Sequence, residues 1–484
     1  MMVGDERRYA DVDDVTATRP VIPHQRGEAR HPVPGEAPGE PAPPRGGTVF
    51  RLALLASLAV LVGAPAGAIA YAAARHERST LVSGQDLAAA GGEQSGGRGG
   101  AKAGQPGTPD ATADALTPNA LPNTLDGRIR KALRDQAAAL LGGDEDGFLR
   151  PVDPSADGLR EDLARRFGSL RQLQVKLWQP RAEAAARTEP DGTATVSVRV
   201  RYCYVVTTCD PMELAAGTRW KVTGQGVTLL EFGTSTELGP RPWEVSELRT
   251  AIGNRVVMAT TARYASRLPA MLAAAEQAAE LTDRFARWGP PPARYVVYLA
   301  GPDEWASWYG MRQESWVIGF ALPLTASATE IVLNANRVDT RQTLDTLRHE
   351  FTHVVTLSGV EKSYEHTWWL VEGIAEYVRV KGSGKPFDQM GDVRAYLRGG
   401  HWKSEIALDD PPADASTADV SGRYGVAYLS LQYLADTFGE DKLLEFFDYA
   451  VRQGISLDDS ARKAFGTSWK DVSNDCAHYV RGHV

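Results

Sequence analysis

The strongest constraint on this chain is a run of 23 residues without a charged side chain, LALLASLAVLVGAPAGAIAYAAA, from Leu52 to Ala74. An apolar run of about 20 residues is long enough to span a bilayer as a helix. A buried core helix would need a neighbouring core, but low-complexity sequence flanks the run on both sides. A signal peptide cleaved at AYAAA is the other alternative, but the region before the run is roughly twice the length of a whole signal peptide. We therefore predict an uncleaved signal anchor, a single transmembrane helix over residues 48–74.

The charges beside this run do not decide its orientation. Arg45 and Arg51 precede it, and Arg75 and Arg78 follow it, so neither flank has an excess of positive charge. A first hydrophobic segment commonly exports the chain that follows. We expect a single-pass protein of the cell membrane whose C-terminal domains are extracytoplasmic.

The segments on either side of the predicted helix lack the composition of a folded domain. Residues 1–47 are polar and rich in Pro, as in ARHPVPGEAPGEPAPPRGG, and cannot bury enough apolar surface to offset chain entropy. Residues 75–121 are rich in Gly, Ser, Ala and Pro. We predict a disordered tail before the membrane, and after it a flexible linker that lets the rest of the chain stand off from the bilayer.

The remaining length is sufficient for two folded domains. In residues 122–240, the helical patterns GRIRKALRDQAAALLGG and LREDLARRFGSLRQL come first, and the alternating segments TATVSVRVRYCYVV, TRWKVTG and VTLLEFG follow. Helices followed by an antiparallel sheet indicate an α+β domain. This order resembles the cystatin-like cone of nuclear transport factor-like domains, which implies a spacer or a module that binds a partner of unknown identity.

The chain has three cysteines. Cys203 and Cys209 lie close together in a strand-like region, where they form either a local disulfide, if the region is extracytoplasmic, or two free thiols. Cys476 stands alone near the C-terminus. Because the chain has no CxxC pair, a cysteine-ligated zinc site is excluded.

Residues 241–484 have mainly helical patterns. We predict one long helix over RVVMATTARYASRLPAMLAAAEQAAELTDRFARW, disturbed at Pro269. Three strand-like segments follow, RYVVYLA, WVIGFALP and TEIVLNAN, and helices then continue nearly to the end of the chain.

The segment DTRQTLDTLRHEFTHVVTL is predicted to be a helix capped by Asp339 or Thr340. His349 and His353 are four residues apart, so both imidazoles project from one face and can share a tetrahedral zinc ion. Glu350 follows the first histidine, where its carboxylate can take a proton from a zinc-bound water. HEFTH thus matches HExxH, a pattern that also arises by chance around two structural histidines.

A second helical segment, HTWWLVEGIAEYVRV, contains two more carboxylates on one face, Glu372 and Glu376. Glu372 is 19 positions beyond His353, which leaves room for a loop and a return. It is a candidate third ligand that leaves the fourth zinc position open for water. Glu376, one turn further, is placed to accept the N–H of a ligating histidine and to fix its tautomer.

Together, HEFTH and WLVEGIAEY resemble the gluzincins, the MA-like zinc metallopeptidases whose second motif is W-L-x-E-G-x-A-E-Y. The resemblance covers roughly residues 255–484. It implies that His349, His353 and Glu372 hold one zinc ion and that Glu350 is the general base. It also implies a strand on the rim of the cleft that binds extended peptide, a position that TEIVLNAN fits.

The resemblance further implies a tyrosine that donates a hydrogen bond to the developing oxyanion. SGRYGVAYLSLQYLADTFG resembles the corresponding helix, and Tyr424 has the expected position near its start. Tyr428 and Tyr433 are close enough in the sequence that either could occupy this position instead, and an aromatic packing residue is the alternative role for Tyr424.

Other zincin types do not fit the spacing. A metzincin would need Gly at Thr356 and a third histidine at Gly359. His366 lies thirteen positions past His353, matches no third-ligand spacing, and is expected to line the loop or the edge of the cleft.

These observations predict an α+β chain with a transmembrane helix, a small cone-like domain and a mainly helical, gluzincin-like peptidase domain with a small mixed sheet over residues 241–484. The predicted function is a bacterial, membrane-anchored zinc metallopeptidase that acts on peptides or proteins. The alternative is a catalytically silent zincin-fold protein that binds or senses a partner, although no ligand or base is missing. A net charge of −8 without a basic block argues against nucleic acid as a partner.

Overall fold

The computed structural model describes residues 123–484, except for residue 225 and residues 311–317, 361–365 and 413–414. The predicted tail, transmembrane helix and linker lie outside the described residues. Among the helices that are described, none has both the length and the apolar character that a bilayer span requires. The described chain is α+β, as predicted, with two sheets and helices against both.

The first half of the described chain, up to the end of strand β5 (Gly226–Phe232), begins with three helices. They are α1 (Leu125–Gly142), α2 (Glu145–Leu149) and α3 (Asp157–Gln172). The side chain of Thr124 accepts a hydrogen bond from the backbone N–H of Gly127 and caps α1. At the other end, Gly143 adopts a φ of 77°, a left-handed conformation that ends the helix at little steric cost.

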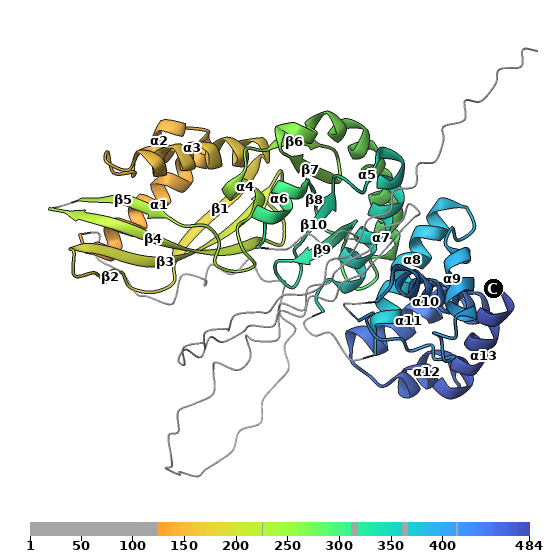
Figure 1. The fold of residues 1–484 in the computed structure, drawn as a ribbon. Helices are drawn as coiled ribbons and strands as arrows, with labels where there is room; N and C mark the ends of the chain where they lie inside the picture. Colours follow the sequence, from red (N-terminus) through yellow and green to blue (C-terminus); the bar gives the residue numbers. More distant parts are fainter. Residues whose placement is uncertain (1–122, 225, 311–317, 361–365, 413–414) are drawn as a thin grey trace, which may run out of the picture. The chain divides into compact units, whose positions relative to one another are not determined.

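An antiparallel sheet follows these helices, with the order β1-β3-β4-β5 and β2 paired to β3. Its strands are β1 (Val175–Ala182), β2 (Arg187–Thr188), β3 (Thr193–Tyr204), β4 (Met212–Thr223) and β5 (Gly226–Phe232). Figure 1 shows α1, α2 and α3 beside this sheet. A disulfide joins Cys203 at the end of β3 to Cys209, so the pairing that the sequence left open is present, whereas Cys476 is a buried free thiol.

The second sheet is mixed, as predicted, with the order β6-β7-β8-β10-β9. Its strands are β6 (Arg249–Ile252), β7 (Val256–Thr260), β8 (Tyr295–Ala300), β9 (Gly319–Pro323) and β10 (Thr329–Asn334). The three central strands β7, β8 and β10 are parallel, and β6 and β9 are antiparallel to their neighbours. This part of the chain also contains two short helices, α4 (Pro242–Val245) and α6 (Pro302–Ser307).

The long helix predicted to start at residue 255 is wrong in its first part. The segment VVMAT is strand β7, and all five of its residues are buried. A continuous apolar run fits a fully buried strand as well as a buried helix, and periodicity alone cannot separate the two. Helix α5 (Leu268–Thr282) begins only after a 3₁₀-helical turn, and Pro269 lies in its first turn, where the missing N–H costs nothing. Pro269 therefore starts a helix instead of disturbing one.

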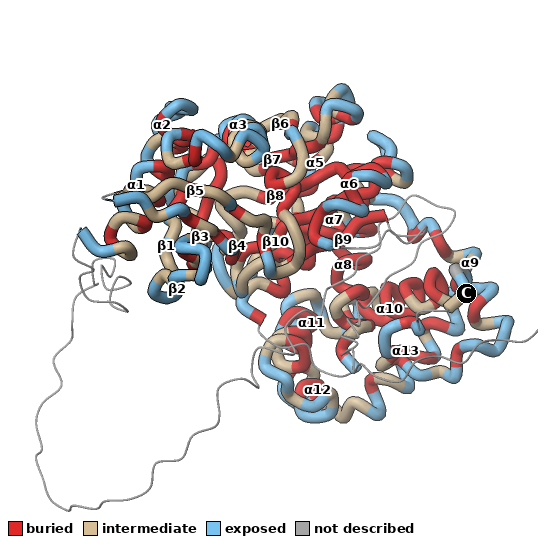
Figure 2. The backbone as a smooth tube through the Cα atoms, turned by 60° about the vertical axis from the view of Figure 1, so that its left-hand side comes forward, coloured by how far each residue is buried: buried red, intermediate tan, exposed pale blue. Residues whose placement is uncertain are grey.

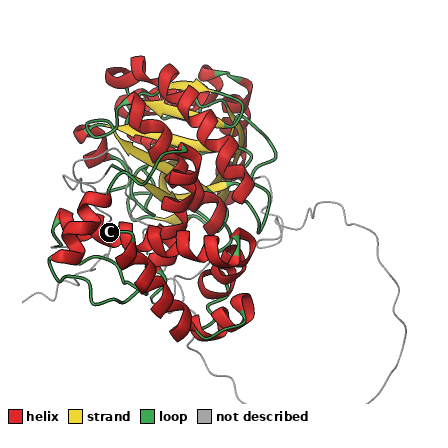
Figure 3. Ribbon diagram, turned by 90° about the vertical axis from the view of Figure 1, so that its right-hand side faces the viewer, coloured by secondary structure: helices red, strands yellow, loops and turns green. Residues whose placement is uncertain are grey.

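The regular elements described after β10 are all helical. They are α7 (Thr340–Leu357), α8 (Trp368–Ser383), α9 (Met390–Arg398), α10 (Thr417–Phe438), α11 (Glu440–Phe447), α12 (Leu457–Phe465) and α13 (Trp469–Gly482). Figure 3 shows only helices and loops around the C-terminus, and Figure 2 shows that α7, α8 and α10 are mostly buried. A β-carbon on Gly373 of α8 would lie 2.4 Å from the Leu431 side chain of α10, so this glycine allows the two helices to pack closely.

The second sheet packs against other elements on both faces. Tyr295 of β8 stacks on Phe351 of α7, with ring centroids 4.0 Å apart. Three residues further along the same strand, the hydroxyl of Tyr298 donates to the hydroxyl of Tyr204 in β3, at 3.4 Å. Because neighbouring side chains of a strand alternate between its faces, β8 contacts α7 on one side and the first half of the chain on the other.

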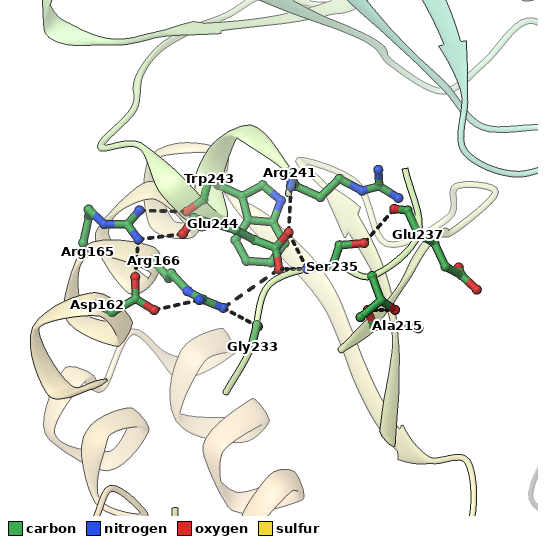
Figure 4. Close-up of polar contacts among 11 residues, drawn as sticks. Asp162, Arg165, Arg166, Ala215, Gly233, Ser235, Glu237, Arg241, Trp243 and Glu244 are labelled. Atoms are coloured by element: carbon green, nitrogen blue, oxygen red, sulfur yellow. Dashed lines mark hydrogen bonds and ion pairs between the residues drawn. The ribbon is translucent and has the colours of Figure 1, made fainter. Parts of the chain in front are cut away.

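A buried polar cluster holds the segment between the two halves (Figure 4). The carboxylate of Glu244 accepts hydrogen bonds from the backbone N–H groups of Arg241, at 2.7 Å, and of Ser235, at 3.0 Å. Arg165 of α3 donates to the backbone carbonyl of Trp243, whose indole packs edge-on against Trp178 at 5.5 Å. Buried contacts therefore fix this segment to α3 and β1. The predicted boundary between residues 240 and 241 falls inside the cluster and stays a prediction.

Candidate metal centre

Helix α7 begins with a capping box. The side chain of Asp339 accepts from the backbone N–H groups of Arg341 and Gln342, each at 2.8 Å, and the Gln342 side chain accepts from the N–H of Asp339, at 3.1 Å. Of the two predicted caps, Asp339 is therefore the one in use. With its start fixed in this way, the C-terminal part of α7 is buried against the second sheet and α8, and it contains His349, Glu350 and His353.

The chain returns in α8 and brings Glu372 to the two histidines. The Nε2 atoms of His349 and His353 are 3.2 Å apart. Oε2 of Glu372 is 3.3 Å from Nε2 of His349 and 3.6 Å from Nε2 of His353. All three residues are at most 2% exposed. Three predicted ligands from two helices thus meet at one buried point, and among the described residues they form the one group of this kind.

The separations of these three atoms fit a zinc ion. Bonds of about 2.0–2.1 Å around a tetrahedral ion place its ligand atoms about 3.3 Å apart. The observed separations of 3.2, 3.3 and 3.6 Å match that value. No described residue donates a hydrogen bond to the buried Oε2 of Glu372, a state that is costly unless a cation is bound there. Two imidazoles and one carboxylate are a common zinc ligand set that leaves a fourth position free.

Glu376 lies behind the ligands and orients one of them. Its Oε1 is 2.6 Å from Nδ1 of His349, so Nδ1 carries an N–H, and Nε2 is the nitrogen that faces the other two ligand atoms. Its Oε2 accepts from Nε and Nη2 of Arg379, at 2.9 and 2.6 Å. Burial lowers the pKa of His349, but the nearby carboxylates of Glu372 and Glu376 outweigh this effect and raise it to about 9. The pKa of His353 is lowered by burial.

Glu350 is fully buried beside the ligands, and neither of its carboxylate oxygens has a hydrogen-bond partner among the described residues. Burial raises the pKa of this carboxyl group well above its usual range. A β-carbon on Gly319, the first residue of β9, would lie 3.2 Å from Oε1 of Glu350. The unpaired carboxylate therefore lies close to the first residue of β9.

Tyr424 is the tyrosine of α10 that reaches the site. Its ring centroid lies 6.3 Å from that of His349 and 5.1 Å from that of Trp368, and its buried hydroxyl has no hydrogen-bond partner in the part of the chain that the structure describes. Burial, followed by the charge of Glu372, raises its pKa well above 10, so the hydroxyl keeps its proton. The two alternatives in the same register lie elsewhere: Tyr428 stacks on Phe387, and Tyr433 packs against Tyr479.

The strand on the rim of the site is β9, and the prediction of TEIVLNAN for this role is wrong. TEIVLNAN forms β10, which pairs with β8 on one side and with β9 on the other, so its backbone groups are already bonded. Among the described strands, β9 pairs with β10 alone. Beside β9 and His353 is a small cavity, with room for about one water molecule, lined by Ala321, Pro323, Thr325, Ala326, Thr329, His353, Leu357 and Val360.

His366 takes no part in the ligand group. Its side chain is 61% exposed, and its Nδ1 lies 2.8 Å from Oδ1 of Asp409. Sequence reasoning missed Arg379 and Gly319. Arg379 follows Glu376 by three residues on a predicted helix, a spacing at which opposite charges pair, so this signal was present. The sequence around Gly319 contains no pattern that indicates a role at the site, because that role depends on the contact between β9 and α7.

A comparison with known protein families matches the part of the chain that contains the candidate metal centre. Residues 272–475, less than half of the chain, match the family described as BSP, peptidase of plants and bacteria. This half is therefore peptidase-like. No curated protein matches the sequence.

Two solved structures share only a weak likeness with the chain. An M1 zinc metallopeptidase from Deinococcus radiodurans is 16% identical, with a TM-score of 0.29, over 63% of this chain and 62% of that one. The native yeast LTA4 hydrolase is 12% identical, with a TM-score of 0.33, over 59% of this chain and 64% of that one. The chain thus covers less than two thirds of either protein. We draw no conclusion about it from these scores.

Proposed function

We propose that this chain is a zinc-dependent peptidase whose ligands are His349, His353 and Glu372. One observation carries the proposal. Three buried ligand atoms have the separations that tetrahedral zinc requires, and an unpaired carboxylate, Glu350, follows the first of them on the same helix. The match of residues 272–475 to a peptidase family supports the same reaction class.

The catalytic roles follow from the environment of each side chain. When bound, zinc would polarise the scissile carbonyl and make water a better nucleophile at neutral pH. Glu350 accepts the proton of the attacking water and later delivers it to the leaving amine. Its carboxylate is free for this role, because no side chain or backbone group of the described residues bonds to it.

Tyr424 is proposed as the donor to the developing oxyanion. Its hydroxyl is buried near Glu372, keeps its proton and forms no hydrogen bond with any described residue. A hydrogen bond formed only in the transition state lowers the barrier without tightening substrate binding. Glu376 holds His349 in the tautomer whose Nε2 faces the zinc position.

The substrate is proposed to be an extended peptide that pairs with the outer edge of β9. This edge has no partner among the described strands, and its first residue, Gly319, lies beside Glu350. The small cavity beside His353, which Ala321 and Pro323 of β9 help to line, is proposed to contact a side chain of that peptide. Attachment to the cell membrane by residues 48–74 is part of the proposal, supported by the uncharged apolar run.

The test compares the full-length chain in detergent with its Glu350→Gln variant. Both are loaded with zinc and incubated with an unbiased peptide pool, and the cut sites are read by mass spectrometry. We expect one zinc per chain in both proteins, and cleavage that falls by about 10²–10⁴-fold in the variant. Equal cleavage by both would contradict the role of Glu350. Stoichiometric zinc without any cleavage would favour the silent binding or sensing protein.

A further inference from the structure

We propose that Arg379 is a positioning residue of the zinc site, which holds the ligand His349 in place through Glu376. The inference rests on the zinc site of the proposed function and not on cleavage itself. Nothing in the two sequence motifs assigns a role to Arg379, and it touches neither the ligands nor Glu350 in any contact of the described residues.

The contacts of Glu376 divide between its two oxygens. Oε1 receives the hydrogen bond from Nδ1 of His349, at 2.6 Å. Oε2 receives two hydrogen bonds from the guanidinium of Arg379, from Nε at 2.9 Å and from Nη2 at 2.6 Å. Two donors from one rigid plane restrict the rotation of the carboxylate. The oxygen that faces His349 is thereby fixed in direction, and so is the ring of this ligand.

Arg379 is itself held from the other side. Its Nη2 also donates to Oδ1 of Asp388, at 3.0 Å, and its guanidinium lies over the ring of Phe387, 5.6 Å from the centroid. The Arg379 side chain is 3% exposed, whereas that of Asp388 is 35% exposed. A continuous series of contacts thus runs from the partly exposed Asp388 through Arg379 and Glu376 to His349.

The shape of the arginine side chain matters as much as its charge. A lysine at this position would keep one positive charge but lose the planar fork that fixes the carboxylate. Partners that orient a metal ligand typically change metal affinity by about 10–100-fold when they are replaced. If Arg379 only neutralised a buried carboxylate, lysine would substitute for it with little effect on zinc binding.

The experiment measures zinc affinity of the full-length chain by competition with a chromophoric chelator. We expect Arg379→Lys to weaken zinc binding by about 10–100-fold. Arg255→Lys is the matched control, since Arg255 makes a similar fork with Asp283, through Nε and Nη2 at 3.0 Å each, away from the ligands. The control should lower thermal stability without changing zinc affinity. Unchanged affinity in a folded Arg379→Lys variant would overturn the proposal.

A second variant covers the case in which Arg379→Lys does not fold. Asp388→Asn removes the outer anchor at a partly exposed position, and we expect it to weaken zinc binding in the same direction but less strongly. If its affinity equals that of the wild type, the proposal is again overturned. A protein whose zinc affinity depends on Arg379 but which cleaves no peptide would refute the proposed function and leave this inference standing.

Discussion

Gly319 and Glu350 face each other so closely that a side chain at Gly319 would contact the Glu350 carboxylate. A β-carbon there would lie 3.2 Å from Oε1 of Glu350 and 2.9 Å from Cδ2 of Leu333, which is buried. The absence of a side chain at Gly319 is therefore what leaves room for the unpaired carboxylate.

Replacing Gly319 with alanine should reduce cleavage while zinc remains bound. The added methyl group would displace Glu350, and a misplacement of about 1 Å can cost about 10²-fold in rate. Steady-state kinetics and zinc content of Gly319→Ala test this expectation. Gly391→Ala is the control, because a β-carbon there meets no atom within 4 Å. Full activity of Gly319→Ala would show that Glu350 has more freedom than its surroundings indicate.

Tyr424→Phe should lower kcat and leave KM and zinc content nearly unchanged. The phenyl ring preserves the packing against His349 and Trp368, but the hydroxyl that would bond the oxyanion is lost. Removing one such donor typically costs about 10²–10³-fold in kcat. Tyr428→Phe on the same helix removes a hydroxyl that donates to Gln432 and should have no effect on kcat. Similar kinetics for the two variants would assign Tyr424 to packing alone.

Zinc should stabilise the folded chain. A ligand that binds only the folded state adds about 4 kcal/mol when its free concentration is 1,000 times its Kd. Thermal unfolding with and without a chelator should therefore show a lower Tm after metal removal and recovery on adding zinc. We expect His353→Ala to lose this response and His401→Ala, with an exposed imidazole beside Asp419, to keep it. A zinc response that survives His353→Ala would place the metal elsewhere.

Ala326→Phe should alter peptide selection without affecting the metal. Ala326 is exposed and lines the cavity beside His353, so a larger side chain can fill that cavity without disturbing the core. We expect a higher KM for peptides cleaved by the wild type, a changed set of cut sites in a peptide pool, and unchanged zinc affinity. An identical set of cut sites would show that the cavity receives no part of the substrate.

Asp153 should make the stability of the first half depend on pH. Hydrogen bonds from Ser155 and Thr228 hold the pKa of its carboxyl group well below the usual value. Because the folded-state pKa is below the unfolded value of about 3.9, the ionised carboxylate stabilises the fold above that pH. This stabilisation is lost as the pH falls. The urea midpoints of wild type and Asp153→Asn should thus differ at pH 7, and the difference should narrow progressively as the pH falls below about 4.

The control for this comparison is Asp135→Asn, which removes a carboxylate paired with the exposed Lys131. We expect its urea midpoint to stay close to that of the wild type at every pH. A gap between wild type and Asp153→Asn that persists unchanged at pH 3 would show that the loss is one of hydrogen-bond geometry and not of ionisation.

The ligand group lay within reach of sequence reasoning, because helical spacing decides which side chains share a face. His349 and His353 are one turn apart, and so are Glu372 and Glu376, so the sequence indicated all four residues before their distances were known. Whether Tyr424, Tyr428 or Tyr433 reaches the site depends on how α10 packs, and only the structure places Tyr424 there. The catalytic roles of these residues stay predictions.

Two errors concern strands, and both have the same cause. The apolar segment VVMAT has no alternation that separates a strand from a helix, because β7 is buried on both faces. The position of TEIVLNAN inside the sheet depends on pairing with β8, which lies about thirty residues earlier in the chain. Pairing partners this distant leave no local trace in a single sequence. The strand within WVIGFALP was predicted, but its position at the edge of the sheet became visible only in the structure.

The packing of β8 has a consequence for how this protein can be divided. Tyr295 of β8 packs against α7, and Tyr298 of the same strand contacts β3, so β8 has contacts with both halves of the described chain. A gene fragment limited to residues 272–475 would omit β6, β7 and Tyr204, and would expose Tyr298 and the buried Glu330 to water. We therefore expect that the peptidase-like half cannot be moved into another protein on its own. Recombination that exchanges it for a homologous half would have to preserve a tyrosine contact made by a different part of the chain.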